Sequence, residues 1–110
     1  MTSRRLIQAT CPECRGPLTE IRDEELVEYE CLVGHRYAPN ALLHAHSDTQ
    51  ERALWAAVVA LEEAENMVRD VSPQLPPAVR PSLESEAAEK RNQAAKIREI
   101  IHNLTPFRTV

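Results

Sequence analysis

Glycine and aromatic side chains are scarce in this 110-residue chain, which has only two glycines and four aromatic residues. A phosphate-binding loop needs several glycines close together, so nucleotide-binding motifs of that kind are excluded. With so few aromatic side chains, a core would consist mostly of Ala, Leu and Val, which is typical of thin helical packing. Both glycines, Gly16 and Gly34, lie in the first third of the sequence. This uneven distribution predicts two parts of different construction.

Long apolar runs are also missing. No stretch approaches the roughly 20 apolar residues that a helix needs to cross a bilayer. The first nine residues show neither a long apolar segment nor a cleavage pattern, so they do not resemble a signal peptide. We therefore expect a cytoplasmic protein without a membrane partner.

Positive charge is limited. The formal net charge is −4, and Lys90 and Lys96 are the only lysines. Proteins that bind nucleic acids through the phosphates usually present a basic face that displaces counterions. This acidic balance argues against a nucleic-acid partner.

The number of cysteines is odd, and all three precede residue 32. A disulfide framework needs paired cysteines and an oxidising compartment, and a chain without an export signal is expected to be in a reducing one. Metal ligation is therefore a better interpretation of these thiols than disulfide formation.

Two close pairs of metal-ligating residues support this interpretation. Cys11 and Cys14 form a Cys-x-x-Cys motif, and Cys31 and His35 follow beyond an expected hairpin. This spacing is typical of zinc ribbons and knuckles, because each tight turn directs two side chains toward one point. We predict one structural Zn²⁺ per chain, bound by the three thiolates and by the neutral imidazole of His35. Iron is a less favoured alternative for such a site.

The residues around these ligands fit the same prediction. Pro12 would stiffen the first turn, and we expect Gly16 and Gly34 to adopt positive φ where the chain bends around the metal. A unit this small could hardly be held together by burial alone. The free energy of metal binding would therefore supply its free energy of folding.

No catalytic or cofactor-binding residues other than the metal ligands are predicted. Four protein ligands leave zinc no open position for a substrate. None of the five serines stands in a G-x-S-x-G motif. His44 and His46 are two residues apart and would point to different faces of a helix, so we interpret them as ordinary surface histidines. We expect the protein not to be an enzyme.

Residues 1–38 read as a small β-rich unit. The segments 18–22 and 26–31 alternate apolar and polar residues and flank the acidic stretch 23–25, which predicts a β-hairpin with Leu18 and Tyr29 as packing residues. Residues 7–9 and 36–38 could add two short strands.

Residues 39–110 read as helical. Pro39 suits the first position of a helix, and residues 41–43 would form a short helical segment. Ser47 and Gln50 resemble a capping box, which predicts a second helix from Thr49 to about Val71. An apolar stripe runs along this helix at steps of three and four residues. Its members are Leu54, Val58, Leu61, Ala64, Val68 and Val71.

A proline-rich turn near residues 72–81 separates this helix from a final one, expected at about 82–103. The stripe of the final helix has heptad-like spacing interrupted by Lys90. Its members are Leu83, Ala87, Ala94, Ile97, Ile101 and Leu104. The predicted fold class is α+β, a zinc-ribbon-like β unit (1–38) followed by an antiparallel helical hairpin (39–110). Trp55, Val59 and Met67 lie beside the first stripe, and would pack on the zinc unit or on another chain.

Several of these motifs together resemble a known module. Cys11-Pro12-Glu13-Cys14, then Gly16-Pro17-Leu18, the run from Tyr29 to Pro39 that reads YECLVGHRYAP, and ALWAA at 53–57 are similar to a C-terminal extension of some bacterial chemotaxis methylesterases of the CheB type. The resemblance covers about residues 10–65. It implies bacterial origin, a cytoplasmic setting, a zinc-bound accessory module and a link to chemosensory or two-component signalling.

The sequence departs from that extension at two positions and in its domain content. Arg15 stands where the extension usually has glycine, and Ala38 stands where a serine usually caps the following helix, so we expect a weaker helix start here. The chain contains neither methylesterase nor receiver sequence, so the esterase activity is not carried over.

The function expected from the sequence is that of a small zinc-binding protein-interaction module in signalling. Its apolar helix stripes predict a homo-oligomer in which two hairpins form a four-helix bundle, and its protein partner is unknown. Two alternatives stay open at this stage. One is a zinc-thiolate redox switch, and the other is a zinc-ribbon regulator that binds nucleic acid.

Overall fold

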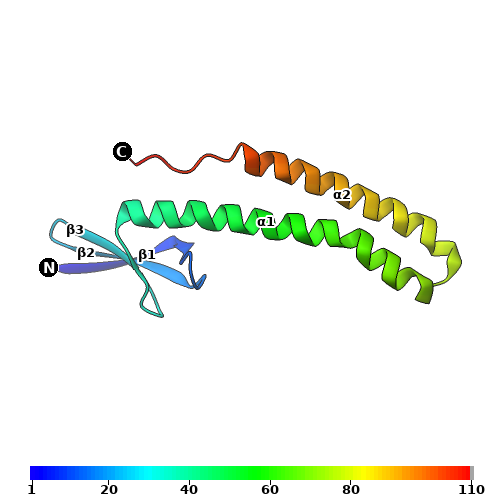
Figure 1. Cartoon of the computed structure of the whole chain (residues 1–110). Helices are drawn as coiled ribbons and strands as arrows, with labels where there is room; N and C mark the ends of the chain where they lie inside the picture. The colour runs from blue at the N-terminus through cyan, green and yellow to red at the C-terminus, as the bar shows by residue number, and fades with distance from the viewer. Residues whose placement is uncertain (110) are drawn as a thin grey trace. The chain divides into compact units, whose positions relative to one another are not determined.

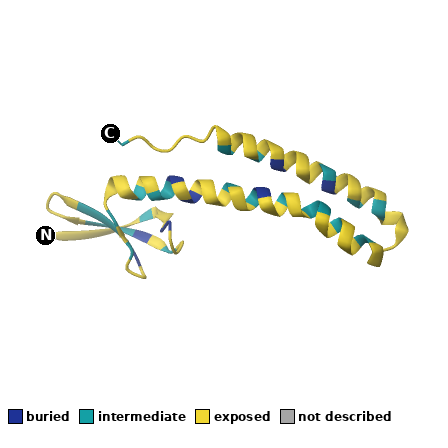
Figure 2. Ribbon diagram, in the orientation of Figure 1, coloured by how far each residue is buried: buried dark blue, intermediate teal, exposed yellow. Residues whose placement is uncertain are grey.

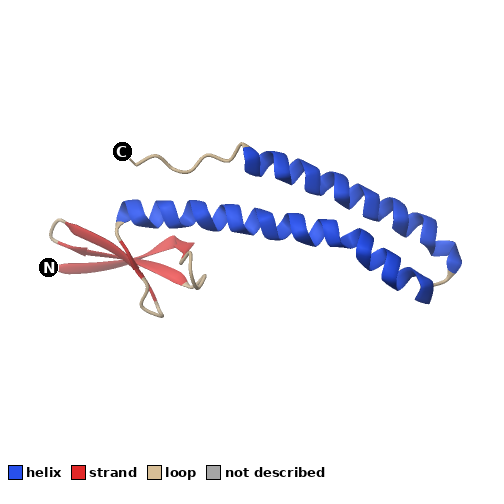
Figure 3. Cartoon of the chain, in the orientation of Figure 1, coloured by secondary structure: helices blue, strands red, loops and turns tan. Residues whose placement is uncertain are grey.

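The structure is a computed structural model that describes residues 1–109, and it has an α+β fold (Figures 1 and 3). A four-stranded sheet precedes two long helices, which confirms the predicted fold class. The elements follow in the order β1 (Thr2–Thr10), β2 (Pro17–Asp23), β3 (Leu26–Cys31), β4 (Arg36–Tyr37), α1 (Pro39–Val71), η1 (Ser72–Gln74), η2 (Pro77–Val79) and α2 (Arg80–His102).

The sheet is antiparallel, and its strands lie in sequence order, β1-β2-β3-β4. The predicted hairpin is present, with Leu18 opposite Cys31 and Asp23 opposite Leu26. Glu24, in the turn, adopts a left-handed φ of 56°. β1 is much longer than the expected residues 7–9. Its first half is polar on both faces, and it becomes a strand through its pairing with β2, where Arg5 lies opposite Glu20.

The β unit has a small core cluster, whose buried residues are dark blue in Figure 2. Cys11 and Leu18 are fully buried and Cys31 is 4% exposed. Half-buried apolar side chains pack around them; these are Ile7, Tyr29, Tyr37 and Leu42. The prediction that Leu18 and Tyr29 are packing residues is therefore confirmed. Two of the three central residues of this core are cysteines of the predicted metal site.

The segment 39–71 forms one continuous helix, so the prediction of a new helix starting with a capping box at Ser47 is wrong. Pro39 is its first residue, as expected, and the carbonyl of Ala38 accepts the N–H of Leu42 at 2.9 Å. The Ser47 hydroxyl donates to the Leu43 carbonyl one turn back, at 3.2 Å, and Thr49 donates to Ala45 at 3.1 Å. Hydrogen bonds from a hydroxyl to the carbonyl four residues earlier allow serine and threonine to lie inside a helix. After Pro39, no proline or glycine interrupts the segment.

The chain divides into two compact units. The first comprises Met1–Thr49 together with the tail at residues 106–109, and the second comprises Gln50–Thr105. The tail joins the first unit through α1, because the Phe107 N–H donates to Ser47 Oγ at 3.3 Å and Thr109 Oγ1 lies 3.2 Å from His44 Nε2. The sequence-based domain boundary between residues 38 and 39 stays a prediction.

The second unit is the predicted helical hairpin, whose turn contains η1 and η2. Val58, Ala87 and Ala94 are its buried apolar residues, at 0, 3 and 1% exposure. α2 begins at Arg80, two residues earlier than expected, with Pro81 in its first turn. The expected stripes hold for the inner positions only, because Val71 and Leu104, at the ends, are 47 and 36% exposed.

Ion pairs border the hairpin on its solvent side. Arg98 donates to Glu62 at 2.6 Å, and Arg91 lies 2.8 Å from Glu65. The Arg98 guanidinium also lies over the Trp55 ring, 5.3 Å from its centroid. Exposed pairs of this kind contribute little to stability. Their main effect is on the alignment of the two helices, and the buried apolar residues stabilise the packing. Within residues 1–109, neither long helix has the apolar stretch that a bilayer crossing requires.

The buried side chain of Val58 gives a direct test of the hairpin packing. Val58→Ala removes two methyl groups from a fully buried position, which should lower the free energy of unfolding by about 2 kcal/mol. Val79→Ala is the matched control, because Val79, in the turn, is 41% exposed and its loss should cost less than about 0.5 kcal/mol. Urea unfolding followed by circular dichroism measures both. Equal midpoints for the two variants would contradict the packing described.

The Arg5–Glu20 pair predicts a pH-dependent contribution to stability. The Arg5 guanidinium, 3.2 Å away, holds the pKa of Glu20 below its ordinary value of 4.5. A lowered folded-state pKa stabilises the fold above the unfolded pKa, and this contribution is lost as pH falls through the folded pKa. Arg5→Met should therefore lower the urea midpoint at neutral pH, and the difference from wild type should shrink as the pH falls below the ordinary carboxyl pKa of 4.5. A difference that persists unchanged in acid would argue against the pair.

Candidate metal centre

The four predicted ligands come from two loops at one end of the sheet. Cys11 and Cys14 lie in the loop that joins β1 to β2, and Cys31 and His35 bound the loop that joins β3 to β4. Because β2 and β3 are paired neighbours, with Leu18 opposite Cys31, the two loops emerge beside each other. The sheet topology therefore brings together ligand pairs that are distant in sequence.

Each loop is closed by its own backbone hydrogen bonds. In the first, the Arg15 N–H donates to the Cys11 carbonyl at 2.8 Å, and the Cys11 N–H donates to Gly16 at 2.7 Å. In the second, Gly34 donates to Cys31 at 3.1 Å, and Cys31 donates to His35 at 3.1 Å. The Thr49 hydroxyl of α1, whose one proton is shared with the Ala45 carbonyl, also lies 3.3 Å from the Pro12 carbonyl. The ligand positions are thus fixed by backbone geometry.

One residue in each loop adopts the left-handed conformation that closes a tight turn. In the second loop it is Gly34, with φ of 108°, as predicted. In the first loop it is Arg15, with φ of 65°. Gly16, for which positive φ was expected, does not adopt it. A side chain on a left-handed residue costs roughly 1–2 kcal/mol because Cβ crowds the neighbouring carbonyl, so Arg15 is strained where glycine would not be.

The ligand atoms of Cys11, Cys14, Cys31 and His35 all lie within 4.8 Å of one another, close enough to bind one metal ion. His35 Nδ1 lies 3.3 Å from Cys31 Sγ and 3.6 Å from Cys11 Sγ. In a tetrahedral zinc site with bond lengths of about 2.0 Å to nitrogen and 2.3 Å to sulfur, ligand atoms are roughly 3.5–3.8 Å apart. The two measured separations are close to that spacing.

The site is partly covered. Cys11 and Cys31 are buried, whereas Cys14 is exposed and the His35 side chain is 33% exposed. Pro12 and Leu18 are also buried and form part of the covered side. Two thiols thus face the core of the β unit, while the other two ligands lie at its surface.

Hydrogen bonds favour the thiolate form of the two buried cysteines. Burial opposes the charge, but the backbone N–H of His35, 3.3 Å from Cys31 Sγ, and further donors in the same loop lower the pKa of Cys31 to about 6. At Cys11 the penalty of burial is likewise outweighed, by hydrogen bonds from the backbone of Cys14 and of Glu13, and the pKa is lowered. Thiolates are the form that binds metals.

The two more exposed ligands have pKa values raised by the same neighbours. The backbone of Gly16 favours the Cys14 thiolate, but burial, hydrogen bonds with Cys31 and Cys11 and the charge of Cys11 raise the pKa of Cys14 overall. Hydrogen bonds to Cys31 and Cys11 raise the pKa of His35. Several negative sulfurs gathered at one point therefore favour a positive charge between them, and a divalent cation would supply it.

Two residues that contact the ligands, Glu13 and Tyr37, were not predicted from the sequence. Glu13 lies 3.0 Å from His35 Nε2, and the Tyr37 hydroxyl donates to Glu13 at 3.0 Å and lies 3.6 Å from Cys11 Sγ. Tyr37 belongs to the motif that carries the family resemblance, and Glu13 stands between two ligands. Their positions were therefore noticeable in sequence, but their contacts depend on the approach of the two loops.

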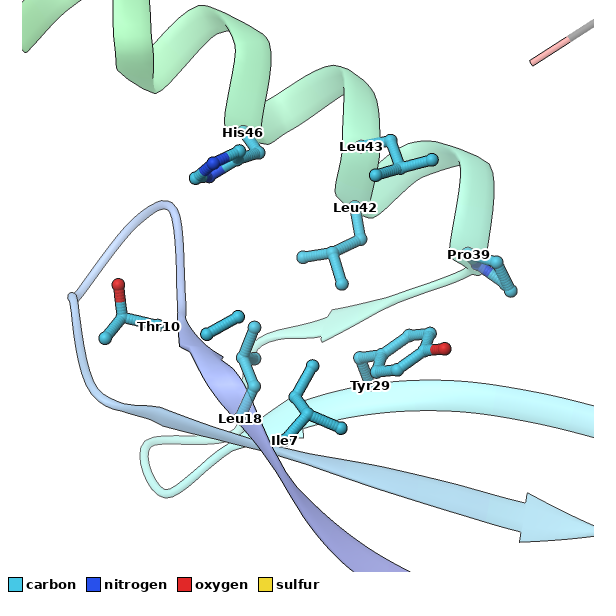
Figure 4. Close-up of a pocket in the computed structure, with 9 residues that line it drawn as sticks. Ile7, Thr10, Leu18, Tyr29, Pro39, Leu42, Leu43 and His46 are labelled. Atoms are coloured by element: carbon cyan, nitrogen blue, oxygen red, sulfur yellow. The ribbon is translucent and has the colours of Figure 1, made fainter. Parts of the chain in front are cut away.

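The remaining histidines form no second metal cluster. Within residues 1–109, the four residues above are the one group of three or more His, Cys, Asp or Glu residues placed to hold an ion. His46 instead lines an apolar cavity of about 310 Å³ between the sheet and the first turns of α1 (Figure 4). Its other lining residues are Ile7, Ala9, Thr10, Leu18, Tyr29, Pro39, Leu42 and Leu43.

No protein-family model, curated protein or solved structure matches the chain. The chemistry of the site is therefore inferred from its donor atoms and their geometry.

The strained first loop predicts an unusual stabilising substitution. Arg15→Gly should raise the free energy of unfolding by about 1 kcal/mol, because glycine accepts a φ of 65° without crowding. Gly34→Ala should lower it by a similar amount, since φ there is 108° although nothing lies within 4 Å of an added Cβ. Thermal unfolding in the presence of excess Zn²⁺ measures both. Opposite signs are expected, and a destabilised Arg15→Gly variant would refute the strain argument.

Proposed function

We propose that the chain binds one structural zinc ion through Cys11, Cys14, Cys31 and His35 and acts as a non-catalytic protein-interaction module. The observation that carries the proposal is the convergence of three thiols and one imidazole nitrogen within 4.8 Å. Three soft sulfur donors and one imidazole are a ligand set that zinc prefers. Four protein donors fill a tetrahedral shell, so the ion would hold the fold together and leave no position for a substrate.

The small size of the core supports a structural role for the ion. Cys11, Leu18 and Cys31 are the buried centre of the β unit, and two of them are proposed ligands. Removing the metal would leave a core of one leucine and two thiols. Metal binding would then contribute much of the folding free energy, as it does in other small zinc modules. The free thiols also favour a reducing compartment such as the cytoplasm.

Exposed apolar side chains support an interaction role. Leu32 and Val33, at the tip of the Cys31–His35 loop, are 86 and 74% exposed. Their loop would be rigid with a ligand at each end, which lowers the entropy cost of binding a partner. On the hairpin, Val59 and Ile100 are 53 and 54% exposed, and Trp55 is 41% exposed. We propose that such helix residues join two copies into a four-helix bundle, and that the partner belongs to a bacterial signalling pathway, as the family resemblance implies.

A second candidate function is a redox switch, and the exposure of Cys14 favours it. Peroxide would oxidise the Cys14 sulfur to a sulfenic acid and be reduced to water. A neighbouring thiolate would then attack that sulfur, form a disulfide and displace hydroxide. Zinc would be released because two of its ligands are lost. Stoichiometric zinc release by mild peroxide, reversed by dithiothreitol, would support the switch, and retention of zinc would exclude it.

The metal content of purified protein tests the main proposal. Mass spectrometry should find one zinc per chain in wild type, and His35→Ala and Cys31→Ser should lose it or bind it far more weakly. His44→Ala is the matched control, because His44 lies outside the cluster, and it should keep its zinc. Well-folded wild type without metal would overturn the proposal.

The state of association is tested separately. Light scattering on the zinc-loaded chain should give the mass of a dimer or larger assembly, and Val59→Glu should shift it toward the monomer by placing a charge on the proposed interface. Glu63→Gln is the control on the same helix. A wild-type monomer at high concentration would refute the bundle and leave the zinc proposal standing.

A further inference from the structure

Glu13 connects the two ligand loops. It lies between Cys11 and Cys14, yet its carboxylate reaches two residues of the other loop and strand. Oε2 lies 3.0 Å from His35 Nε2, and Oε1 accepts the Tyr37 hydroxyl proton at 3.0 Å. Each carboxylate oxygen thus has its own partner, so one side chain bridges the first loop to the second at two points.

These contacts account for both nitrogens of the His35 ring. Nδ1 lies 3.3 Å from Cys31 Sγ and 3.6 Å from Cys11 Sγ, at the centre of the cluster. Nε2 points away from the sulfurs, toward the Glu13 carboxylate. A carboxylate only accepts hydrogen bonds, so Nε2 must carry a proton, and a neutral ring then has its lone pair on Nδ1. That lone pair is the one that faces the sulfurs of Cys31 and Cys11.

We infer that Glu13 is a positioning residue of the metal centre, which fixes His35 in the Nε2–H form so that it binds the ion through Nδ1. The inference rests on the proposed zinc function and deepens it. Metal-ligating histidines generally donate their second ring N–H to a carboxylate or carbonyl, and loss of that partner costs about 10- to 100-fold in metal affinity.

The contact acts through orientation more than through charge. The His35 and Glu13 side chains are 33 and 59% exposed, and ion pairs at such surfaces contribute little by themselves. Tyr37, half-buried against the core, supplies the fixed point. Its hydroxyl holds the carboxylate in place and also lies 3.6 Å from Cys11 Sγ. The series of contacts Tyr37–Glu13–His35 therefore links the core of the β unit to the imidazole ligand.

Three variants of the full-length chain test the inference. Glu13→Ala removes both acceptors, Glu13→Gln keeps the shape and one carbonyl oxygen, and Glu25→Gln is the control on an exposed carboxylate outside the cluster. Competition with a chelator should show zinc affinity reduced about 10- to 100-fold in Glu13→Ala, by less in Glu13→Gln and not at all in Glu25→Gln. Circular dichroism of the zinc-loaded proteins verifies that each variant is folded.

The ring itself supplies a readout that a merely structural role would not change. In ¹⁵N-labelled, zinc-loaded wild type, two-bond ¹H–¹⁵N correlations should identify His35 as metal-bound at Nδ1 and protonated at Nε2. Glu13→Ala should broaden or shift these signals and weaken the Nε2–H resonance. Tyr37→Phe should move them in the same direction by a smaller amount, since the carboxylate would lose its anchor.

The possible outcomes separate this inference from the zinc proposal. Wild type without zinc would overturn both. Wild type that binds zinc through Nε2 of His35, or a folded Glu13→Ala variant with wild-type affinity and wild-type ring signals, would overturn the role of Glu13 and leave the four ligands unaffected. A loss of affinity together with a changed ring signal, absent from Glu25→Gln, would establish it.

Discussion

The structure depends on the meeting of two short loops at one point. Each loop is closed by its own hydrogen bonds, and the pairing of β2 with β3 places the loops side by side. The same pairing buries Leu18 against Cys11 and Cys31, so the core and the candidate metal centre are built from the same side chains. A change that disturbs one necessarily disturbs the other. The pairing of β2 with β3 therefore assembles both the core of this unit and the four donor atoms.

Features with a local cause could be predicted from the sequence. The hairpin follows from two β-prone segments on either side of an acidic turn, of which residues 27–31 alternate regularly, and the ligand set follows from two spaced pairs. Features that depend on distant partners could not be predicted. The first half of β1 is polar and is a strand only because β2 pairs with it. Ser47 carries the signature of a helix start, but its hydroxyl bonds one turn back and the helix continues. The contacts of Glu13 likewise arise only when the second loop is in place.

Arg15 carries backbone strain in the first loop. Its φ of 65° is one that glycine would adopt without crowding. The strained arginine is tolerated because hydrogen bonds fix the first loop at two places. The Cys11 N–H donates to the Gly16 carbonyl, and the Thr49 hydroxyl contacts the Pro12 carbonyl. Strain of this kind persists only where the surroundings determine the conformation. Gly16, the neighbouring glycine, does not relieve it, because the turn needs its left-handed residue one position earlier.

The first unit is built from two segments that are far apart in the sequence, and this affects how the length of the chain between them can vary. Its tail returns to α1 at Ser47 and His44, so residues 50–105 form, topologically, a closed loop between two segments of one unit. The entropy cost of closing a loop grows only with the logarithm of its length, by about 0.6 kcal/mol for each doubling. That relation describes a flexible chain. A folded antiparallel hairpin already has its two ends at the same end of the helix pair, so the entropy cost of closing the loop is lower still. Evolution could therefore lengthen or shorten the two helices together by whole turns with little effect on the first unit, whereas unequal changes would carry the tail away from Ser47.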